Sequence, residues 1–575
     1  MDTQRIIALI VFSFSSLLLW EAWQKHNQPA ALPTTAVATQ TAPASVNKVN
    51  ADAPGGANAV PTATMPTSPA PSAVVSAPAG DAPAAATQRV AVRTDTLDVD
   101  LDALSGDIRQ VVLRKHHARG DNSKPFVLMQ EKVGHYFIAQ TGLLGAGLPN
   151  HTSKWTLIGG QPGQQHELGN REKLDIVFAN ADTPGVTVNK IYTFKPGSYV
   201  IDVRYDIKNE SAAAIAAKAY FQFLRDANPP EGESTGNNPF MGVATFTGPA
   251  IYTDVKKFQK VAISDVEKNK AEHVKESGDG WLAMVQHYFV SAWLPQGTTG
   301  REFFTKRVTE KLFSAGVILP IAAVSANSSA SLSMPLYVGP QEQENLNNLA
   351  PGLGLVIDYG FLTVLAYPMF VVLSFINNLV GNWGWTIIIF TILLKLVFFP
   401  LNQKSGKSMA HMKTLMPKME ALKARYGDDK LKLNQAMMEL YKSEKVNPLG
   451  GCLPIIIQIP FFISLYWVLL GAVELRNTPW ILWIDDLSTP DPLYILPVIM
   501  GVSMFVQTKL NPQPTDPIQA KVMTILPIVF SIMFFFFPSG LVLYWTMQNI
   551  LGIAQQWYIN KTFSTAPAKP ATPKR

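Results

Sequence analysis

A single lysine in a long apolar stretch is the residue of this sequence that most directly indicates chemistry. Lys395 lies in the run WGWTIIIFTILLKLVFFP and is the only Asp, Glu, Lys or Arg within six apolar spans. A charge inside a bilayer costs roughly 2.5–3.5 kcal/mol, and more without water or a partner. Lys395 follows Trp383 by twelve residues, about 18 Å along a helix, which places it in the inner half of a bilayer. The ammonium either snorkels to the interface near Asn402 or faces a water-filled cavity that attracts a negatively charged group.

Uncharged polar side chains on the same and other spans are candidates to line such a cavity. Thr391 precedes Lys395 by one helical turn and shares its face. The candidates on other spans are Gln458, Ser503, Gln507, Tyr544, Gln548 and Gln555. None of them is a carboxylate, so we expect water or a visiting anionic group to neutralise the lysine.

The segment 402–450 is predicted to form a helical hairpin. Gly427-Asp428-Asp429 supplies a stop for one helix and an N-cap for the next. The first helix carries methionines near a 3–4 spacing: Met409, Met412, Met416 and Met419. This stripe is typical of the hairpin's own core, but a Met-rich face also suits contact with varied apolar segments. Both interpretations stay open.

Six apolar spans must position these residues. They lie at 6–20, 383–401, 453–473, 493–507, 522–537 and 541–557. No small-x-small cleavage site closely follows the first, so residues 1–26 are expected to be an uncleaved signal anchor rather than a signal peptide. The other five form a predicted membrane core over 382–560. The composition, 47% hydrophobic and 16% charged over 575 residues, agrees with a membrane protein of at least two structural units.

Charge asymmetry predicts how these spans are oriented. Segment 402–450 and the tail 561–575, which begins at Lys561, are basic, whereas the loop 474–492 is acidic. Because Lys/Arg-rich loops stay in the cytoplasm, both basic segments and both termini are expected there. Both basic segments fall on the cytoplasmic side only if 341–381 does not cross the membrane but lies along its outer surface as an interfacial helix. Gly381-Asn382 is also expected to be a poor tight turn between two spans.

The amino-terminal half of the chain is predicted to form a linker and a β-domain outside the cytoplasm. Residues 27–88 are rich in Pro and Ala and are expected to be flexible. Residues 89–340 contain strand candidates at 174–178, 190–195, 199–208, 281–293 and 332–338, with strict alternation over 199–208. We predict a large antiparallel β-sandwich.

Several kinds of activity have no support in the sequence. Cys452 is the only cysteine, which excludes an intrachain disulfide and a cysteine zinc site. There is no P-loop and no metal-binding motif, so the sequence predicts no cofactor and no enzyme. The net charge of +6 is modest for this length and gives no sign of nucleic-acid sequence recognition.

Four long motifs resemble the YidC/Oxa/Alb family of membrane protein insertases in its Gram-negative form. They follow in order over about 355–560: NWGWTIIIFTILLKLVFFPL, KVNPLGGCLPIIIQIPFFISLYWVLLGAVELR, DPLYILPVIMGVSMF and FFFFPSGLVLYW. The resemblance implies an inner-membrane insertase and chaperone with a periplasmic β-domain. It also implies a hydrophilic groove in which Lys395 takes the place of a functional cation that is Arg in many relatives, with Tyr544 and Trp545 as aromatic groove residues.

The resemblance further implies the partners. These are nascent membrane proteins, the ribosome, the Sec translocon and the lipid bilayer, with the methionine stripe and Lys561 as contact candidates. Two alternatives belong to other classes. A secondary transporter would need a repeated pair of interrupted helices, which the sequence lacks, and a membrane-anchored periplasmic binding protein would place its function in residues 89–340.

Overall fold

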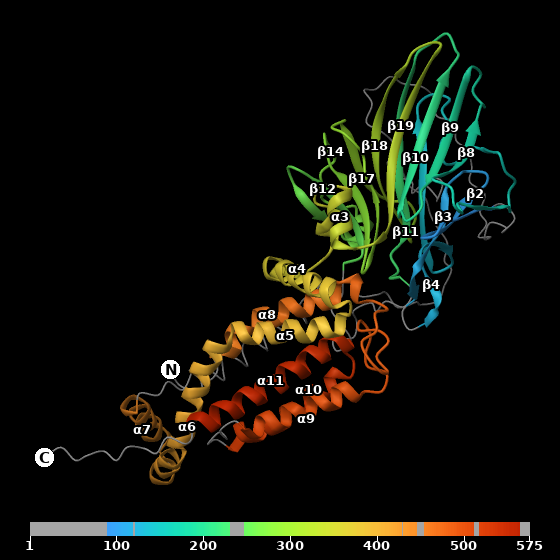
Figure 1. Cartoon of the computed structure of the whole chain (residues 1–575). Coiled ribbons are helices and arrows are strands. Elements are labelled where there is room, and N and C mark those ends of the chain that lie inside the picture. Colours follow the sequence, from blue (N-terminus) through green and yellow to red (C-terminus); the bar gives the residue numbers. More distant parts are fainter. Residues whose placement is uncertain are drawn as a thin grey trace, which may run out of the picture. The chain divides into compact units, whose positions relative to one another are not determined.

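The computed structural model describes residues 89–118, 121–230, 246–427, 429–444, 453–510 and 517–563 (Figure 1). The expected anchor, the linker 27–88 and most of the tail 561–575 lie outside these residues. Hairpin residues 407–427 and 429–444 form a compact unit of their own, and the other described residues form a second unit.

The second unit begins with a β-domain that contains two large sheets. The first sheet has ten strands, in the spatial order β14 (Glu276–Ser277), β17 (Arg301–Arg307), β18 (Leu312–Val324), β11 (Ile215–Asp226), β5 (His135–Leu144), β4 (Asp121–Lys132), β3 (Ile108–Ala118), β2 (Leu97–Asp102), β1 (Arg89–Arg93) and β7 (Gln165–Glu167). Among the described pairings in this sheet, β1 with β7 is parallel and the others are antiparallel.

The second sheet has nine strands. Their order is β13 (Lys257–Lys260), β12 (Gly248–Thr253), β15 (Trp281–Gln286), β16 (Phe289–Trp293), β19 (Ser328–Pro340), β10 (Val200–Asn209), β9 (Val186–Phe194), β8 (Leu174–Asn180) and β6 (Thr156–Ile158). One hydrophobic cluster joins residues of both sheets, which makes the domain a β-sandwich. The predicted fold of this region is therefore confirmed.

The strand pattern of β10 explains why the sandwich forms here. Ile201, Val203 and Tyr205 are fully buried, and the residues between them are partly exposed. Strands β9 and β10 pair antiparallel with Tyr205 opposite Lys190, so the predicted hairpin is confirmed.

The expectation of one strand over 281–293 is wrong. The chain reverses at His287 and Tyr288, and β15 pairs antiparallel with β16. The turn contains neither glycine nor proline, and the ring of His287 stacks on that of Tyr288 at 3.8 Å. Both strands are buried on both faces, so mostly apolar residues lie on either side of Gln286 and His287, and the two strands look like one run in the sequence.

Short elements lead from the sandwich to the membrane helices. They are α2 (Ile263–Glu267) within the β-domain, then α3 (Gln343–Leu349), η2 (Leu353–Val356), η3 (Gly360–Leu362) and α4 (Thr363–Val380). The predicted helix over 341–381 is thus several elements. One face of α4 packs on the protein core through residues such as Met369 and Leu373, while Phe375 and Leu379 on its other face are exposed.

The turn after α4 corrects a second expectation. Gly381 adopts a left-handed conformation with φ of 71°, and its N–H bonds to the carbonyl of Asn377. Asn382 then caps α5 (Trp383–Val397), since its side chain accepts a hydrogen bond from the Trp385 N–H at 3.2 Å. Gly381-Asn382 is therefore a competent tight turn, because glycine tolerates positive φ and asparagine caps a helix.

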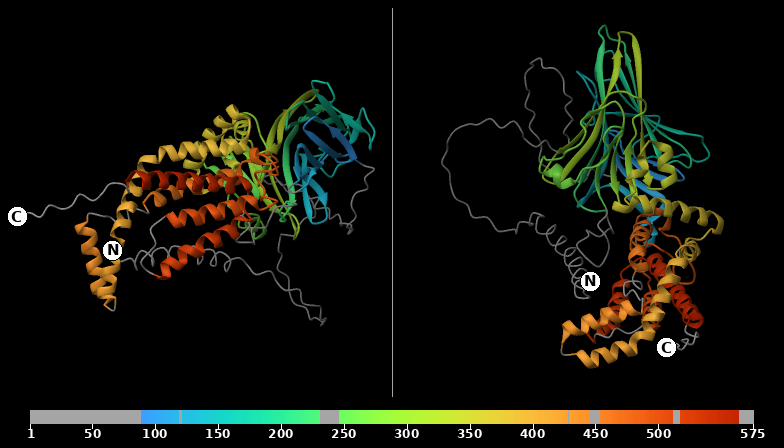
Figure 2. Two further views of the ribbon diagram at one scale, coloured as in Figure 1. Left: turned by 60° about the horizontal axis from the view of Figure 1, so that its bottom comes forward. Right: turned by 90° about the vertical axis from the view of Figure 1, so that its left-hand side faces the viewer.

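The remaining helices are α6 (Phe399–Tyr426), α7 (Lys430–Ser443), α8 (Leu453–Gly471), η5 (Val473–Leu475), α9 (Ile495–Leu510), α10 (Pro517–Phe534) and α11 (Ser539–Phe563). Figures 1 and 2 show α5, α8, α9, α10 and α11 running alongside one another as a bundle. Their apolar faces share a hydrophobic cluster. The expected fifth span at 522–537 is shifted, because its helix begins at Pro517 and ends at Phe534.

The axis of the second predicted span, 383–401, bends sharply near its end. Residues Trp383–Val397 and Phe399–Gly406 meet at 61°. Pro400 lacks an N–H and so cannot bond to the carbonyl of Leu396 four residues earlier, which accounts for the break at Phe398. Taken singly, one described helix, α4, is long and apolar enough to cross a membrane, and the bent pair is a second if counted as one span.

The unit formed by residues 407–427 and 429–444 is a helical hairpin. Asp429 caps α7 by accepting a hydrogen bond from the Lys432 N–H at 3.1 Å. Leu415 and Met419 are buried against apolar residues of the same unit. The short turn brings the two helices back along each other, so their facing stripes bury one another.

Candidate functional site

Lys395 lies in the last turn of α5, and its ammonium is directed to α11. Its Nζ lies 3.8 Å from the point where a Cβ on Gly552 would stand. The side chain is partly exposed, and it forms no ion pair or hydrogen bond with any other residue that the structure describes. The ammonium therefore lies beside a neighbouring helix of the bundle.

Gln507 of α9 reaches the same point. Its Nε2 lies 3.0 Å from the Cβ position of Gly552 and its Cδ lies 3.7 Å from it. Within the described part of the chain, its amide likewise has no hydrogen-bond partner. Three helices thus bring together an ammonium, an amide and a glycine without a side chain.

A second group of polar side chains is hydrogen-bonded between helices. Gln458 of α8 donates from Nε2 to Oδ1 of Asn402 at 3.0 Å. Its Oε1 accepts a bond from Nε2 of Gln548 on α11 at 3.3 Å. These two hydrogen bonds link the start of α6, α8 and α11 through uncharged amide groups. The amides therefore satisfy one another without a charged partner.

A third group joins α9 to α11. Asn549 donates from Nδ2 to the hydroxyl oxygen of Ser503 at 3.1 Å, and Ser503 donates to the carbonyl of Met500 at 2.6 Å. Thr391 is fully buried and donates to the carbonyl of Ile387 at 2.6 Å, one turn earlier in α5. These hydroxyls are therefore satisfied within the protein.

The two aromatic candidates pack on one ring of α8. Tyr544 stacks on Phe462 at 6.1 Å, and Trp545 meets the same ring edge-on at 4.5 Å. Tyr544 is only 2% exposed, so it belongs to the bundle's core, whereas Trp545 is partly exposed. The pair forms an aromatic layer between α8 and α11.

The structure also gathers residues that the sequence did not single out as site residues. From the sequence, Asn402 only marks the interface, and Asn549 and Gly552 are not among the predicted site residues. A signal existed for Asn549, because it lies on one helix face with Trp545 and Gln548 at spacings of three and four. Gly552 continues that face, but a residue without a side chain gives no chemical signal.

The hairpin methionines do not share one environment. Met412 and Met419 pack in the hairpin's own core, and Met416 is partly exposed. The side chain of Met409 lies outside what the structure describes. Lys561 is exposed in the last turn of α11, where its Nζ lies 5.2 Å from the ring of Trp557.

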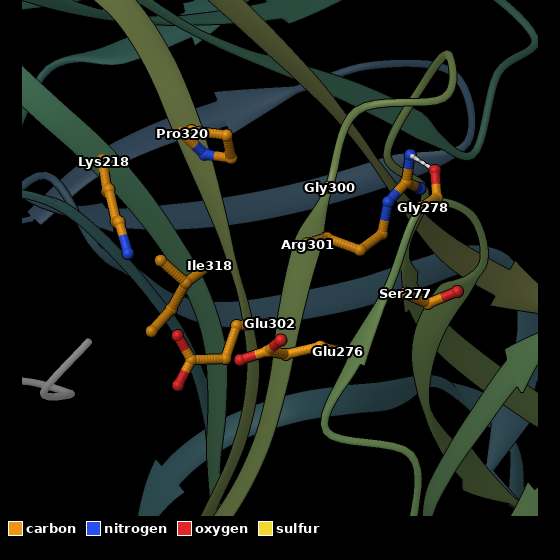
Figure 3. Close-up of a pocket in the computed structure, with 9 residues that line it drawn as sticks. All are labelled: Lys218, Glu276, Ser277, Gly278, Gly300, Arg301, Glu302, Ile318 and Pro320. Atoms are coloured by element: carbon orange, nitrogen blue, oxygen red, sulfur yellow. Dashed lines mark hydrogen bonds between the residues drawn. The ribbon is translucent and has the colours of Figure 1, made fainter. Parts of the chain in front are cut away.

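A surface hollow of about 430 Å³ lies elsewhere, on the first sheet of the β-domain (Figure 3). It is lined by Lys218, Glu276, Ser277, Gly278, Gly300, Arg301, Glu302, Ile318 and Pro320. Arg301 is occupied by backbone carbonyls, among them those of Gly278 and Gly280. Ser277 donates to Asp279, and no histidine lines the hollow, so these residues do not form a nucleophile and its base. None of the predicted site residues lies here.

Among the described residues, no group of three or more His, Cys, Asp or Glu side chains is placed to hold a metal ion. Around Lys395, the described polar side chains of the bundle named above are neutral amides and hydroxyls. Such a set can hold and release an anionic or polar group by hydrogen bonding.

The sequence matches two family models that together cover most of the chain. Residues 89–372 match the family described as "YidC periplasmic domain", and residues 375–566 match "60Kd inner membrane protein". The chain is 50% identical over 573 residues to "Membrane protein insertase YidC" of Aromatoleum aromaticum, a match that covers 99% of this chain and 100% of that relative. It is also 50% identical over 562 residues to the protein of the same name from Dechloromonas aromatica, covering 98% and 97%.

Among solved structures, the chain is similar to one described as "Active YidC insertase crystal structure with the first transmembrane domain resolved". That similarity has 18% sequence identity and a TM-score of 0.38, and it covers 82% of this chain and 92% of the other. The two family matches cover both the β-sandwich and the helical bundle, and the relatives are half identical over almost the whole length. The chain therefore belongs to the YidC family, whose members are inner-membrane proteins with a periplasmic domain.

Proposed function

We propose that this chain is a membrane protein insertase and chaperone that moves nascent inner-membrane proteins laterally into the bilayer. Its family membership supports the activity, and one observation carries the mechanism. The partly exposed Lys395 side chain places its ammonium beside α11, with no carboxylate bonded to it among the described residues. A cation in that place is available to a group that arrives from outside the protein.

The energetics require no nucleotide. A client helix of twenty apolar residues gains about 6–12 kcal/mol on entering lipid, at −0.3 to −0.6 kcal/mol each. The barrier is the polar tail that must cross. A hydrated, positively charged groove shortens the dry path and holds acidic tail residues for a time, and a membrane potential assists each negative charge by about 2.3 kcal/mol per 100 mV. The proposed activity is a transfer between environments, not an enzymatic reaction.

We assign the groove to residues on α5, α8, α9 and α11. Lys395 and Gln507 would receive polar client groups, and the amide chain through Gln458 would keep one wall polar. Thr391, Ser503 and Asn549 would support these walls, since their hydrogen bonds lie within the protein. The following residues complete the proposed client path: Tyr544, Trp545, Gln548 and Gln555.

We also propose a topology of six transmembrane helices with both termini in the cytoplasm. Its support is the charge asymmetry: the basic hairpin and tail against the acidic 474–492 loop. We propose that α4 lies along the outer surface, because one of its apolar faces packs on the protein core and the opposite face is exposed, as suits lipid.

A short apolar helix would lower the barrier further. The apolar part of α10, from Val522 to the end of the helix at Phe534, spans about 20 Å at 1.5 Å per residue, against roughly 30 Å of hydrocarbon. Lipid beside it would thin to match. A client tail that crosses next to α10 would then meet a narrower apolar layer.

Ribosomes and the Sec translocon are proposed as partners on the resemblance alone. The basic hairpin, with Met416 partly exposed, and Lys561 are the candidate contacts on the cytoplasmic side. Crosslinking a stalled nascent chain to these positions, and to the helices α5 and α11, would test both assignments.

Lys395 can be tested with purified protein in liposomes. The comparison uses wild type, Lys395→Arg, Lys395→Ala and Lys395→Met, and it measures the insertion of a single-span client with an acidic tail. We expect Lys395→Arg to stay within about threefold of wild type. Loss of the charge should slow insertion at least tenfold, because a cation and a carboxylate 4 Å apart interact by several kcal/mol in a partly wet protein.

Lys509→Met, which removes a lysine at the end of α9, is the matched control. Equal activity of all Lys395 variants would remove this residue from the mechanism. Deleting residues 89–340 separates the insertase from the periplasmic binding protein, because an insertase should keep most of its activity. Insertion that fails altogether in the wild-type protein would reject the proposed function.

A further inference from the structure

Three helices of the bundle begin beside one loop, residues 477–492, which lies between η5 and α9. At the start of α11, the N–H of Ser539 donates to the carbonyl of Thr489 at 2.7 Å. The next N–H, that of Gly540, donates to the carbonyl of Leu487 at 2.9 Å. The first N–H groups of a helix have no partner within it. The loop therefore caps α11 with its own backbone.

The start of α9 is held by a buried carboxylate of the same loop. Asp491 is only 1% exposed. Its Oδ1 accepts a hydrogen bond from the N–H of Leu493 at 3.0 Å, and its Oδ2 accepts one from the N–H of Leu496 at 2.7 Å. Nε1 of Trp483, in the middle of the loop, donates to Oδ1 at 2.9 Å. No lysine or arginine pairs with Asp491 among the described residues, so these N–H donors and the positive end of the α9 dipole stabilise its charge.

The start of α5 contacts the loop as well. Asn382, which caps α5, donates from Nδ2 to the carbonyls of Pro479 at 3.3 Å and Trp480 at 3.4 Å. The ring of Trp480 packs directly on Gly384, where a Cβ would overlap the ring. A glycine in the first turn of α5 therefore lets the loop lie against the helix backbone.

The depth of the polar residues in the bundle follows from these common starts. Lys395 lies twelve residues after the start of α5, and Gln507 lies twelve residues after the start of α9, about 18 Å along each helix. Gly552, on which both side chains pack, lies thirteen residues after the start of α11, about 20 Å along it. A helix that tilted by about 5° at the loop would move its residue at that depth by about 1.6 Å. The packing of these three residues therefore depends on how firmly the loop holds the helix starts.

We propose that Asp491 is a positioning residue of this insertase. It fixes the 477–492 loop as a clasp on the starts of α5, α9 and α11, and the clasp keeps Lys395 and Gln507 at one depth and spacing in the bundle. The inference rests on the proposed function and adds to it a part of the protein that acts without touching a client. Asp491 influences insertion through the spacing of helices.

The test measures helix spacing and insertion separately. Full-length protein with Cys452→Ser would have spin labels in pairs at exposed positions far from the clasp: Val397 of α5, Val506 of α9 and Tyr558 of α11. Electron paramagnetic resonance gives the distribution of each distance, and insertion of a single-span client into liposomes is measured on the unlabelled variants. We expect Asp491→Ala to broaden all three distributions and to slow insertion about tenfold, in line with the loss of one helix cap.

The loop offers a matched control and two independent variants. Asp485 is an exposed aspartate of the same loop that forms no hydrogen bond or ion pair with other described residues, so Asp485→Ala should behave as wild type. Asp491→Asn keeps one of the two acceptor oxygens, and its effect should lie between those of wild type and Asp491→Ala. Gly384→Ala should push Trp480 away and broaden only the distances to Val397. A general loss of stability would not be confined to one helix.

Several outcomes would overturn the inference. The clasp does not position the site if Asp491→Ala gives the distances and the insertion rate of Asp485→Ala. Broader distances with an unchanged insertion rate would show that helix spacing does not matter for insertion, and slower insertion at unchanged distances would give Asp491 another role. Should Asp491→Ala fail to fold, Asp491→Asn and Gly384→Ala provide the same test. Failure of the wild-type protein to insert the client would instead reject the proposed function.

Discussion

Replacing Arg476 by alanine should loosen the contact between the β-sandwich and the helical bundle. Arg476 follows η5, directly after α8, and is only 8% exposed. Its guanidinium lies 5.1–5.2 Å from the ring centres of Phe126, Tyr288 and Phe289. Its Nη2 also donates to the carbonyl of His117 at 2.8 Å. One side chain from the membrane part thus contacts both sheets.

The size of the effect follows from these contacts. Each ring contact contributes about 0.5–1 kcal/mol, and a hydrogen bond from a charged donor about 1.5–3 kcal/mol. Loss of the arginine also removes the cost of burying its charge, so we expect a net loss of about 2–4 kcal/mol. Burial, followed by the charge of Arg476, lowers the pKa of the nearby His116 to about 4. His116 is therefore neutral at pH 7, and it does not repel the arginine.

Hydrogen exchange is the suitable assay, because a protein of several parts does not unfold in one step. Mass spectrometry would follow peptides covering 108–118 and 470–480 in full-length protein in detergent. Arg476→Ala should speed exchange through local opening on the order of a hundredfold. The exchange rate of Arg476→Lys should lie between those of wild type and Arg476→Ala, because lysine keeps the charge but loses the planar stacking group.

Arg204→Ala is the matched control, since Arg204 is partly exposed and pairs with Asp206 on the surface. A surface pair of this kind is worth at most about 1 kcal/mol. The reasoning is refuted if Arg476→Ala leaves exchange in both segments at the level of this control. In that case the ring contacts would be a consequence of docking and not its cause.

Two further predictions concern buried charges outside the membrane spans. Burial, and then the charge of Glu342, raises the pKa of Glu474 to about 7. The folded protein therefore binds this proton more tightly, so stability should fall by up to about 3 kcal/mol as pH rises from about 4.5 to 7 and stay level above. In Glu474→Gln, the melting temperature should lose that dependence on pH; an unchanged slope would contradict the assignment. In the sandwich, Lys190→Met leaves the fully buried Asp107 with Arg109 as its remaining cation, which should cost about 3 kcal/mol. The melting temperature should recover in part when Asp107→Asn is added, and no recovery would show that the lysine acts through packing.

The sequence predicted the parts of this protein that depend on local patterns. Alternation over 199–208 gave a correct hairpin, and hydropathy gave the helices of the bundle to within a few residues at most ends. Lys395 could be singled out because a charge in an apolar span is costly wherever its neighbours lie. Gln507 was named from its type alone, and the structure brings it to the same point as the lysine.

Other features depend on residues that are distant in the sequence. Arg476 and His117 are 359 positions apart, so no local spacing could indicate their contact. The reversal at His287 and Tyr288 was missed because both flanking strands are buried on both faces. Gly381-Asn382 was misjudged because its turn depends on backbone conformation and capping, which composition does not display. Gly552 is absent from the predicted site because a residue without a side chain gives no chemical signal.

The polar side chains of the bundle divide by how they are satisfied. Gln458 and Gln548 bond across helices, which lowers the cost of an amide among apolar residues and ties those helices together. Lys395 and Gln507 lack such bonds within the described chain. A protein selected only for stability would pair them. Leaving a cation and an amide open at one point costs stability, and that cost is consistent with a site that holds a carboxylate only while a client passes.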